Sequence, residues 1–259
     1  MDQKSVPELE APVARAPPRY DPGAIGGADF VSAGGRPLKV VCGVEQIVNL
    51  EGAEVGSRVT PTVIDTQKGR ILRARVRAKL DASDFWEIDK AVLEIARPLL
   101  QHPERPVIVP LSFHSISRRR VRERLFDTVR ITPEQTVTAM IAEIVGMDQG
   151  TPEGRLADAV TIIRPFSSAV FVEALSANLT KPFIIHGVGG VTLDLRDVRR
   201  GERTVLTALR AFGKAGSGLV RTLIARGLPS AEFLELAQAA GVTHASVRGV
   251  GPLTEQAAA

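Results

Sequence analysis

The sequence predicts an α/β protein built as a TIM-like (β/α) barrel. Eight runs with strand character alternate mostly with helical segments over about 210 of the 259 residues, at the small end of this architecture. Several runs are apolar without alternation, as parallel strands buried on both faces are. An open doubly wound sheet is the alternative, but no G-x-G-x-x-G sequence follows the first strand-like run. We therefore expect a barrel.

The chain divides into an arm, a barrel and a tail. Residues 1–36 are rich in proline and glycine and show little apolar periodicity, which predicts a disordered arm. The barrel is expected over 37–250, followed by a tail over 251–259. Its first two strands, 38–50 and 54–64, are separated by three residues, so we expect them to form an antiparallel hairpin.

The later elements follow from apolar spacing and from proline and glycine positions. The predicted strands are 106–112, 137–145, 168–174, 191–195, 219–225 and 244–248. The predicted helices are 84–99, 115–129 and 152–163, one that ends at Gly213, and one between Ser230 and Gly241.

Composition excludes several classes of protein. No apolar run approaches 18 residues, so no membrane span is expected. The single cysteine, Cys42, rules out an internal disulfide and fits a reducing cytoplasm, where we expect the protein. The four histidines are scattered without a cysteine partner, which argues against zinc.

The positive charge is concentrated in one segment. The formal net charge is +4, and residues 116–130 hold six arginines against Glu123 and Asp127. An apolar stripe in this segment indicates an amphipathic helix with a solvated basic face, and binding of phosphate or an acidic partner is the alternative. Without interleaved aromatics or a nucleic-acid module, we do not expect DNA or RNA binding. The candidate partner surface comprises Arg118, Arg119, Arg120, Arg122 and Arg124.

A carboxylate stands near the end of one buried strand. Glu143 is the first charge in the apolar run 137–145, and a turn containing Gly146 and Gly150 follows. Binding sites of α/β barrels and sheets lie at the carboxyl ends of their strands. Glu143 is therefore a candidate site residue, although a solvated loop acid would give the same pattern.

In order and spacing, the strand ends resemble the EAL domain family of bacterial cyclic-di-GMP phosphodiesterases over about residues 40–249. Glu45–Leu50 resembles the family's Q-P-I-V-D-L strand, Val109–Ser112 its V-N-L-S, and Ala142–Val145 its E-I-T-E. The other segments that carry the resemblance are Phe85–Ala96 (L-D-x-W-V-L), Val170–Leu175 (A-L-D-D-F), Val191–Leu195 (L-K-I-D), Ile224–Ser230 (V-A-E-G-V-E-T) and Ala239–Val242 (the closing helix exit).

The resemblance implies a barrel whose strand ends gather carboxylates and an asparagine around divalent metal, with a lysine beside the attacking water. Most of these positions differ here. Arg58 stands at the signature glutamate, Pro110 at the asparagine, Thr192 at the lysine and Arg226 at a late glutamate. The acids that match are Glu143, Glu173 and Asp194. These seven residues form the candidate vestigial pocket.

Arginines at the metal-ligand positions of the family would repel a divalent ion. A divalent ion about 4 Å from one guanidinium is repelled by roughly 8 kcal/mol at an effective dielectric of about 20. Hard cations need several oxygen ligands, which one or two remaining carboxylates do not supply. We therefore expect Arg58 and Arg226 to occupy the metal space and to pair with Glu143 and Glu173, with no resident cofactor. Arginines that point to solvent are the alternative.

These substitutions predict a catalytically inactive regulatory or adaptor domain in bacterial signalling. Binding of a protein partner is the leading expectation, through the basic helix or the arm, although the arm could be a passive tether. Cyclic-di-GMP binding is a further expectation, weakened because Pro61 or Thr62 stands where the family has an arginine. The resemblance also allows a homodimer. The alternative is an active enzyme, either a divergent Mg²⁺-dependent phosphodiesterase or another barrel chemistry using Glu143, Glu173 and Asp194.

Overall fold

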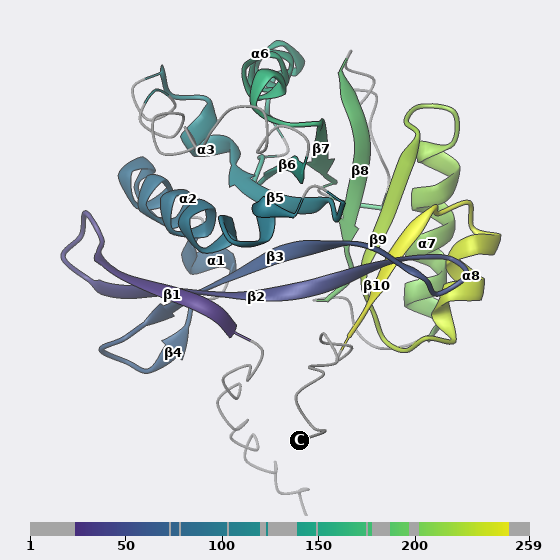
Figure 1. Ribbon diagram of the computed structural model, residues 1–259, viewed down its shortest axis with the longest axis horizontal. Helices are drawn as coiled ribbons and strands as arrows, with labels where there is room; N and C mark the ends of the chain where they lie inside the picture. Colours follow the sequence, from purple (N-terminus) through teal and green to yellow (C-terminus); the bar gives the residue numbers. More distant parts are fainter. Residues whose placement is uncertain are drawn as a thin grey trace, which may run out of the picture.

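The computed structural model describes residues 24–248 except 73, 78, 103, 120–122, 124–138, 149, 175, 178–186 and 197–201. Eight strands close into a mixed barrel, which confirms the predicted fold (Figure 1). Around the barrel their order is β2-β10-β9-β8-β7-β6-β5-β3, and β3 pairs back onto β2. These strands are β2 (Pro37–Asn49), β3 (Glu54–Asp65), β5 (Val107–Ser112), β6 (Met140–Val145), β7 (Ala169–Glu173), β8 (Val188–Asp194), β9 (Thr222–Leu228) and β10 (His244–Val247).

Strand β2 runs against both of its barrel neighbours. It pairs antiparallel with β3 and with β10, whereas the pairs from β3 through β5 and on to β10 are parallel. The expected antiparallel hairpin is thus confirmed. Both strands of the hairpin extend past the barrel, where β4 (Arg70–Ile71) adds to the edge of β3.

A further strand, β1 (Ala24–Val31), corrects the expectation that the arm reaches residue 36. It pairs antiparallel with the first half of β2. The following turn is held by Ala33, whose N–H donates to the Asp84 carboxylate at 2.7 Å. With two adjacent glycines inside it and a proline-rich segment before it, β1 carries a weak sequence signal, and tertiary pairing with β2 decides its conformation. Residues 1–23 and the predicted tail lie outside the described residues.

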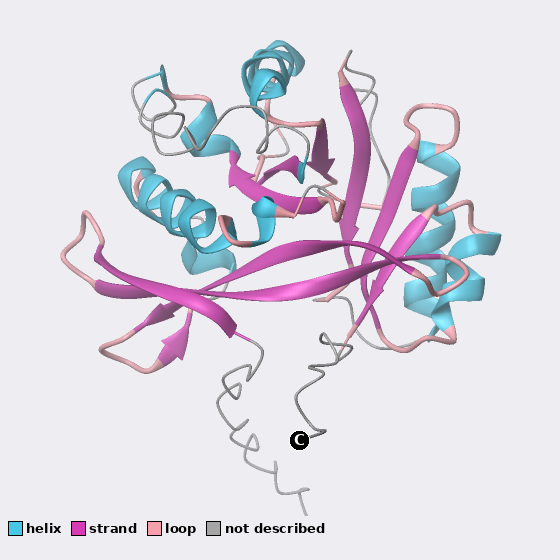
Figure 2. Cartoon of the chain, in the orientation of Figure 1, coloured by secondary structure: helices cyan, strands magenta, loops and turns pink. Residues whose placement is uncertain are grey.

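The helices pack around the strands (Figure 2). Helix α2 begins with a capping box, in which the Asp81 carboxylate accepts from the Ser83 N–H and the Asp81 N–H donates to Asp84. No helix in the described part of the chain is long and apolar enough to cross a bilayer. The helices are α1 (Ala74–Arg77), α2 (Ala82–Ala96), α3 (Phe113–Ile116), α6 (Glu153–Ile163), α7 (Glu202–Gly216) and α8 (Phe233–Ala239), with 3₁₀ turns η1 (Leu99–Gln101) and η2 (Arg164–Phe166).

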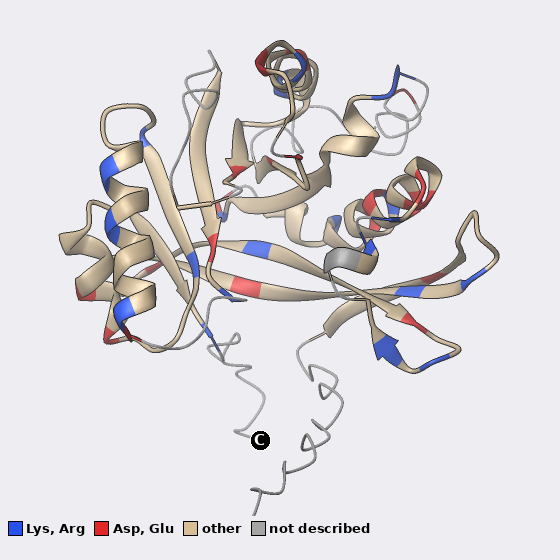
Figure 3. Cartoon of the chain, turned by 180° about the vertical axis from the view of Figure 1, so that it is seen from behind, with Lys and Arg blue, Asp and Glu red and all other residues tan. Residues whose placement is uncertain are grey.

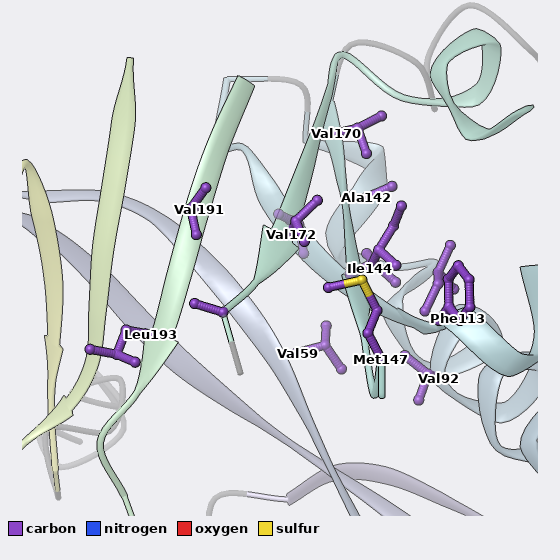
Figure 4. Packing of buried hydrophobic residues seen from close by; sticks show 14 of the residues in the cluster. Val59, Val92, Phe113, Ala142, Ile144, Met147, Val170, Val172, Val191 and Leu193 are labelled. Carbon is purple, nitrogen blue, oxygen red and sulfur yellow. The ribbon is translucent and has the colours of Figure 1, made fainter. Parts of the chain in front are cut away.

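Side-chain alternation along the strands separates two apolar regions. Residues that point outward from the barrel, such as Val59, Ile144 and Val172, form the main core against the helices (Figure 4). A second, smaller cluster consists of Ile47, Ile108, Phe171 and Ile224. These four belong to the opposite parity of their strands, so they fill the barrel interior below the candidate site.

Candidate functional site

A layer of charged and polar residues lies above the interior apolar cluster, two residues further along the same strands. Glu45 is two positions from Ile47, Glu173 two after Phe171, and Arg226 two after Ile224. Period-two alternation therefore turns both sets inward and places the charges toward the carboxyl ends of the parallel strands. We call this set the charged layer; it contains Glu45, Arg58, Glu143, Glu173, Thr192, Asp194, Arg226 and Ser246.

Glu143 lies at the centre of the charged layer and is fully buried. Its Oε2 accepts from Arg58 Nε at 2.7 Å and lies 2.5 Å from Arg58 Nη2, and Arg58 is itself only 3% exposed. Its Oε1 accepts from the Thr192 hydroxyl at 2.5 Å. Both carboxylate oxygens are therefore engaged by side chains of β3 and β8.

Arg226 brings four acids together from the other side. Its Nη2 lies 3.2 Å from Glu45 Oε2 and 3.7 Å from Asp194 Oδ2. Its Nη1 lies 3.6 Å from Glu173 Oε1 and 3.9 Å from Glu143 Oε1. The guanidinium is fully buried. The ion pairs expected of Arg58 and Arg226 with Glu143 and Glu173 are confirmed, and both arginines are inside the barrel rather than in solvent.

Sequence reasoning missed Glu45. Its carboxylate accepts from Arg226 Nε and Nη2, both at 3.2 Å, and from the Ser246 hydroxyl. On the long hairpin it is the register partner of Arg58, where an acidic and a basic position lie on neighbouring strands in Figure 3. The signal in the sequence was weak, because a plain hairpin that pairs Leu50 with Glu54 would set Glu45 opposite Val59. In the structure, the register shift between Ile47 and Val48 sets it opposite Arg58.

Asp194 also has a partner that the sequence reasoning missed. It accepts from the Arg196 backbone N–H at 2.9 Å and from Arg196 Nε at 3.0 Å. Pro110 is buried on β5 in register with Glu143, and it offers no ligand atom in its side chain. All seven residues predicted for the pocket thus lie in the barrel on β3, β5, β6, β7, β8 and β9, and six of them are joined by ion pairs or hydrogen bonds.

The electrostatics of the layer follow from these pairs. Burial alone would raise the pKa of Glu143, but the charges of Arg58 and Arg226 outweigh burial and lower this pKa below its ordinary value. The same balance lowers the pKa of Glu45, mainly through Arg226. Burial and the neighbouring Glu143 charge raise the pKa of Glu173, which is 24% exposed. Burial and Arg226 lower the pKa of Arg58.

The residues of the charged layer do not fit a divalent cation. Within the described part of the chain, no group of three or more His, Cys, Asp or Glu is arranged to hold a metal ion. Arg226 Nη1 is the one buried nitrogen in the layer without a hydrogen-bond partner among the described residues. An N–H donates, so an acceptor would satisfy it and a cation would not. A divalent ion near a guanidinium would also meet a repulsion of roughly 8 kcal/mol at 4 Å.

The candidate partner surface is only partly described. Arg118 and Arg119 are exposed just after α3, and Arg119 Nε pairs with Glu123 Oε1 at 2.9 Å. Arg120, Arg122 and Arg124 lie outside the described residues, as does most of the predicted helix 115–129. The region beside it contains a cavity of about 330 Å³ lined by Ile116, Ser117, Arg155, Asp158, Ala159, Thr161 and Ile162.

A closed eight-stranded barrel with one antiparallel strand and inward charges at the strand ends defines the class of fold. Comparison with solved structures assigns it: the chain has the fold of EAL domains. An EAL domain protein from Listeria monocytogenes matches with a TM-score of 0.56 and 14% identity, over 80% of this chain and 85% of that one.

Two further solved structures match at similar levels. The PaMucR phosphodiesterase, in complex with cyclic-di-GMP, matches with a TM-score of 0.59 and 12% identity, over 80% of this chain and 93% of that one. The FimX EAL domain from Pseudomonas aeruginosa, bound to cyclic-di-GMP, matches with a TM-score of 0.55 and 15% identity, over 80% and 88%. No family model matches the sequence, and no curated protein does. These likenesses therefore establish the fold.

Proposed function

We propose that this protein is a catalytically inactive, EAL-like regulatory domain of cyclic-di-GMP signalling that acts by binding a protein partner. The observation that carries the proposal is the pair of buried arginines in the charged layer. Arg58 and Arg226 engage the carboxylates Glu45, Glu143, Glu173 and Asp194. Oxygen ligands that a divalent cation would need are committed to guanidinium groups instead.

Energetics favour this interpretation over a metal enzyme. Each arginine is desolvated, so it remains buried only because carboxylates compensate its charge. A cation would have to displace the arginines from their partners and leave those charges unpaired in the interior. Thr192 offers a hydroxyl that donates to Glu143, and a neutral hydroxyl whose proton is already donated is no substitute for a general base beside an attacking water.

Turnover of cyclic-di-GMP in Mg²⁺ or Mn²⁺ is the direct test, with the PaMucR phosphodiesterase as positive control. We expect no hydrolysis above the buffer rate. Hydrolysis that disappears in Glu143→Gln would overturn the proposal and support a divergent phosphodiesterase. Hydrolysis that persists in Glu143→Gln would point to a contaminating enzyme, and a second preparation would then settle the rate of the intact chain.

Cyclic-di-GMP binding without hydrolysis is a second proposed property. It rests on the fold, because the PaMucR and FimX domains with the same fold are described in complex with this dinucleotide. Isothermal calorimetry with cyclic-di-GMP and no added metal separates a receptor from an adaptor that ignores the nucleotide. A saturable heat supports the receptor, and its absence leaves protein binding as the whole function.

The exposed arginines beside α3 are the surface proposed for the partner. Affinity capture from a lysate of the source bacterium should recover a specific protein with the intact chain. Arg118→Glu with Arg119→Glu should remove it. The matched control is Arg203→Glu with Arg210→Glu, which makes the same charge change on the exposed face of α7. Equal loss in both variants would contradict this choice of surface.

A further inference from the structure

Strand β1 ends the sheet with a free edge. Among the described residues it pairs on one side only, with β2, and it lies at the outer end of the extended hairpin (Figure 1). Its sequence, AIGGADFV, contains no proline or lysine and one charge, Asp29. Natural edge strands usually carry such residues to prevent pairing. Apart from Asp29 and the bulge near Ala24, β1 has none of these features, so its edge is open to a further strand.

The turn after β1 shows which backbone groups face the free edge. The Ser32 N–H donates to the Arg36 carbonyl at 2.9 Å, so the backbone of Ser32 points toward β2. Hydrogen-bonding groups alternate along an antiparallel strand. The N–H and C=O of Val31, Asp29 and Gly27 therefore point away from β2. Val31 is in register with Pro37, which has no N–H to donate, so this pair cannot be a hydrogen-bonded one, in agreement with the assignment.

A second copy of β1 satisfies these groups when it runs antiparallel about a two-fold axis. The axis must pass beside a residue and not between two residues, because only then do the outward-pointing N–H and C=O groups of one copy lie opposite those of the other. An axis at Asp29 sets two carboxylates against each other, which is unfavourable. An axis at Gly27 sets Asp29 opposite the apolar Ile25. An axis at Ala28 instead sets Gly27 opposite Asp29 and Val31 opposite Ile25.

Charge complementarity selects the axis at Ala28. The Lys39 side chain lies along Gly27, with its Cε 3.1 Å from where a Gly27 Cβ would stand. Lys39 is the register partner of Asp29 in its own chain, and no ion pair between the two occurs among the described residues. In this register, Asp29 of the other copy is opposite Gly27, beside the Lys39 side chain, so each Lys39 lies next to an acid of both copies, and the symmetry makes this contact twice. Val31, 69% exposed, and Ile25, 42% exposed, would cover each other.

We propose that two copies of this chain form an isologous dimer in which their β1 strands pair antiparallel, with the two-fold axis at Ala28. The pairing extends the sheet from one copy into the other. The bulge between Ala24 and Gly26 includes Ile25, so the hydrogen-bonded pairing is limited to residues 26–30 of each copy, and Ile25 meets Val31 through side-chain contact alone. The short contact predicts a dimer that dissociates on dilution. This inference is independent of the proposed regulatory function, because it uses no residue of the charged layer.

Disulfide trapping of the full-length chain tests the register. Ala28 faces its own copy in a non-hydrogen-bonded pair, where Cα atoms are about 4.5 Å apart, within disulfide range. Ala28→Cys should form a covalent dimer under a glutathione redox buffer. Val31→Cys is the matched control, because this more exposed position would lie about 20 Å from its own copy. The native Cys42 is buried and should not interfere.

Sedimentation velocity over a range of concentrations tests the association without a new cysteine. The mass of the native chain should rise toward twice 27.7 kDa. Asp29→Asn should reduce the association constant several-fold, because it removes the carboxylate beside Lys39 of the other copy without setting a like charge against Lys39 of its own chain. Glu51→Gln, the same loss of charge at the opposite end of the hairpin, should leave it unchanged. A monomer at every concentration, equal trapping of Val31→Cys, or dimerisation of Asp29→Asn at native strength would overturn the proposal.

Discussion

Two carboxylates of this protein are both removed from water, yet their environments shift their pKa values in opposite directions. Glu143, in the barrel, is fully buried between Arg58 and Arg226, and its pKa is lowered. Asp89, on α2 against β5, is 3% exposed, and burial raises its pKa to about 7. Both Asp89 oxygens accept from the Ser112 N–H, at 3.0 and 3.2 Å, and no ion pair of Asp89 occurs among the described residues. Burial penalises a charge, and the partners decide whether the charge stays.

The largest effect is expected when the barrel acids lose their shared cation. Arg226→Ala should lower the free energy of unfolding by about 5 kcal/mol, because four carboxylates near the buried guanidinium become uncompensated. Chemical denaturation measures this loss. Arg196→Ala is the control: its partly exposed pair with Asp194 should contribute about 1 kcal/mol or less.

The same variant tests why the site does not fit a metal. With the guanidinium gone, the freed carboxylates should bind a divalent ion, so Mn²⁺ should raise the melting temperature of Arg226→Ala and leave the native chain unchanged. A similar Mn²⁺ effect on both proteins would show that arginine is not what excludes the cation.

A smaller, pH-dependent effect is expected at Asp89. Its folded pKa of about 7 exceeds its ordinary 3.8, so its stability contribution is present below pH 3.8 and is lost as pH rises through 7. Relative to Asp89→Asn, the native chain should lose up to about 4 kcal/mol over this window. Urea unfolding from pH 4 to 8 measures both proteins. Parallel profiles would mean that Asp89 has a charged partner after all.

The apolar cluster beneath the charged layer provides a charge-free reference. Gly190→Ala would place a Cβ 2.8 Å from the Phe171 ring, and such overpacking should cost about 1–3 kcal/mol. The loss should be the same at pH 5 and pH 8. Adding Phe171→Leu should make the double variant less unstable than the two single losses predict. A pH-dependent loss would show that the two layers are coupled.

The smallest effect is expected at Glu173, the acid with the least compensation. Its raised pKa means that its contribution is present below its ordinary 4.5 and is lost as pH rises through the folded value. Glu173→Gln should therefore be more stable than the native chain at pH 8, by less than about 1 kcal/mol, and equal to it at pH 4. Thermal melts at the two pH values measure this. A less stable variant at pH 8 would show that the Arg226 pair outweighs repulsion from Glu143.

The sequence predicted the barrel because strand and helix periods are local properties. Apolar runs such as Val107–Ser112 are buried on both faces wherever they pair, and the parity of each strand sets which residues turn inward. The positions of Arg58 and Arg226 at strand ends also predicted that both would form ion pairs with acidic residues. Segment β1 was mistaken for part of a disordered arm because its two glycines weaken the strand signal and its conformation depends on pairing with β2.

The sequence by itself determined the kind of fold and the presence of opposite charges at its strand ends. Only the tertiary structure decided the pairing, because closure of the barrel brings Glu45 to Arg226 across 181 positions and Glu143 to Arg58 across 85. Contacts so distant in the chain leave no periodic signal. They depend on register and shear, which are set by the packing of all eight strands together.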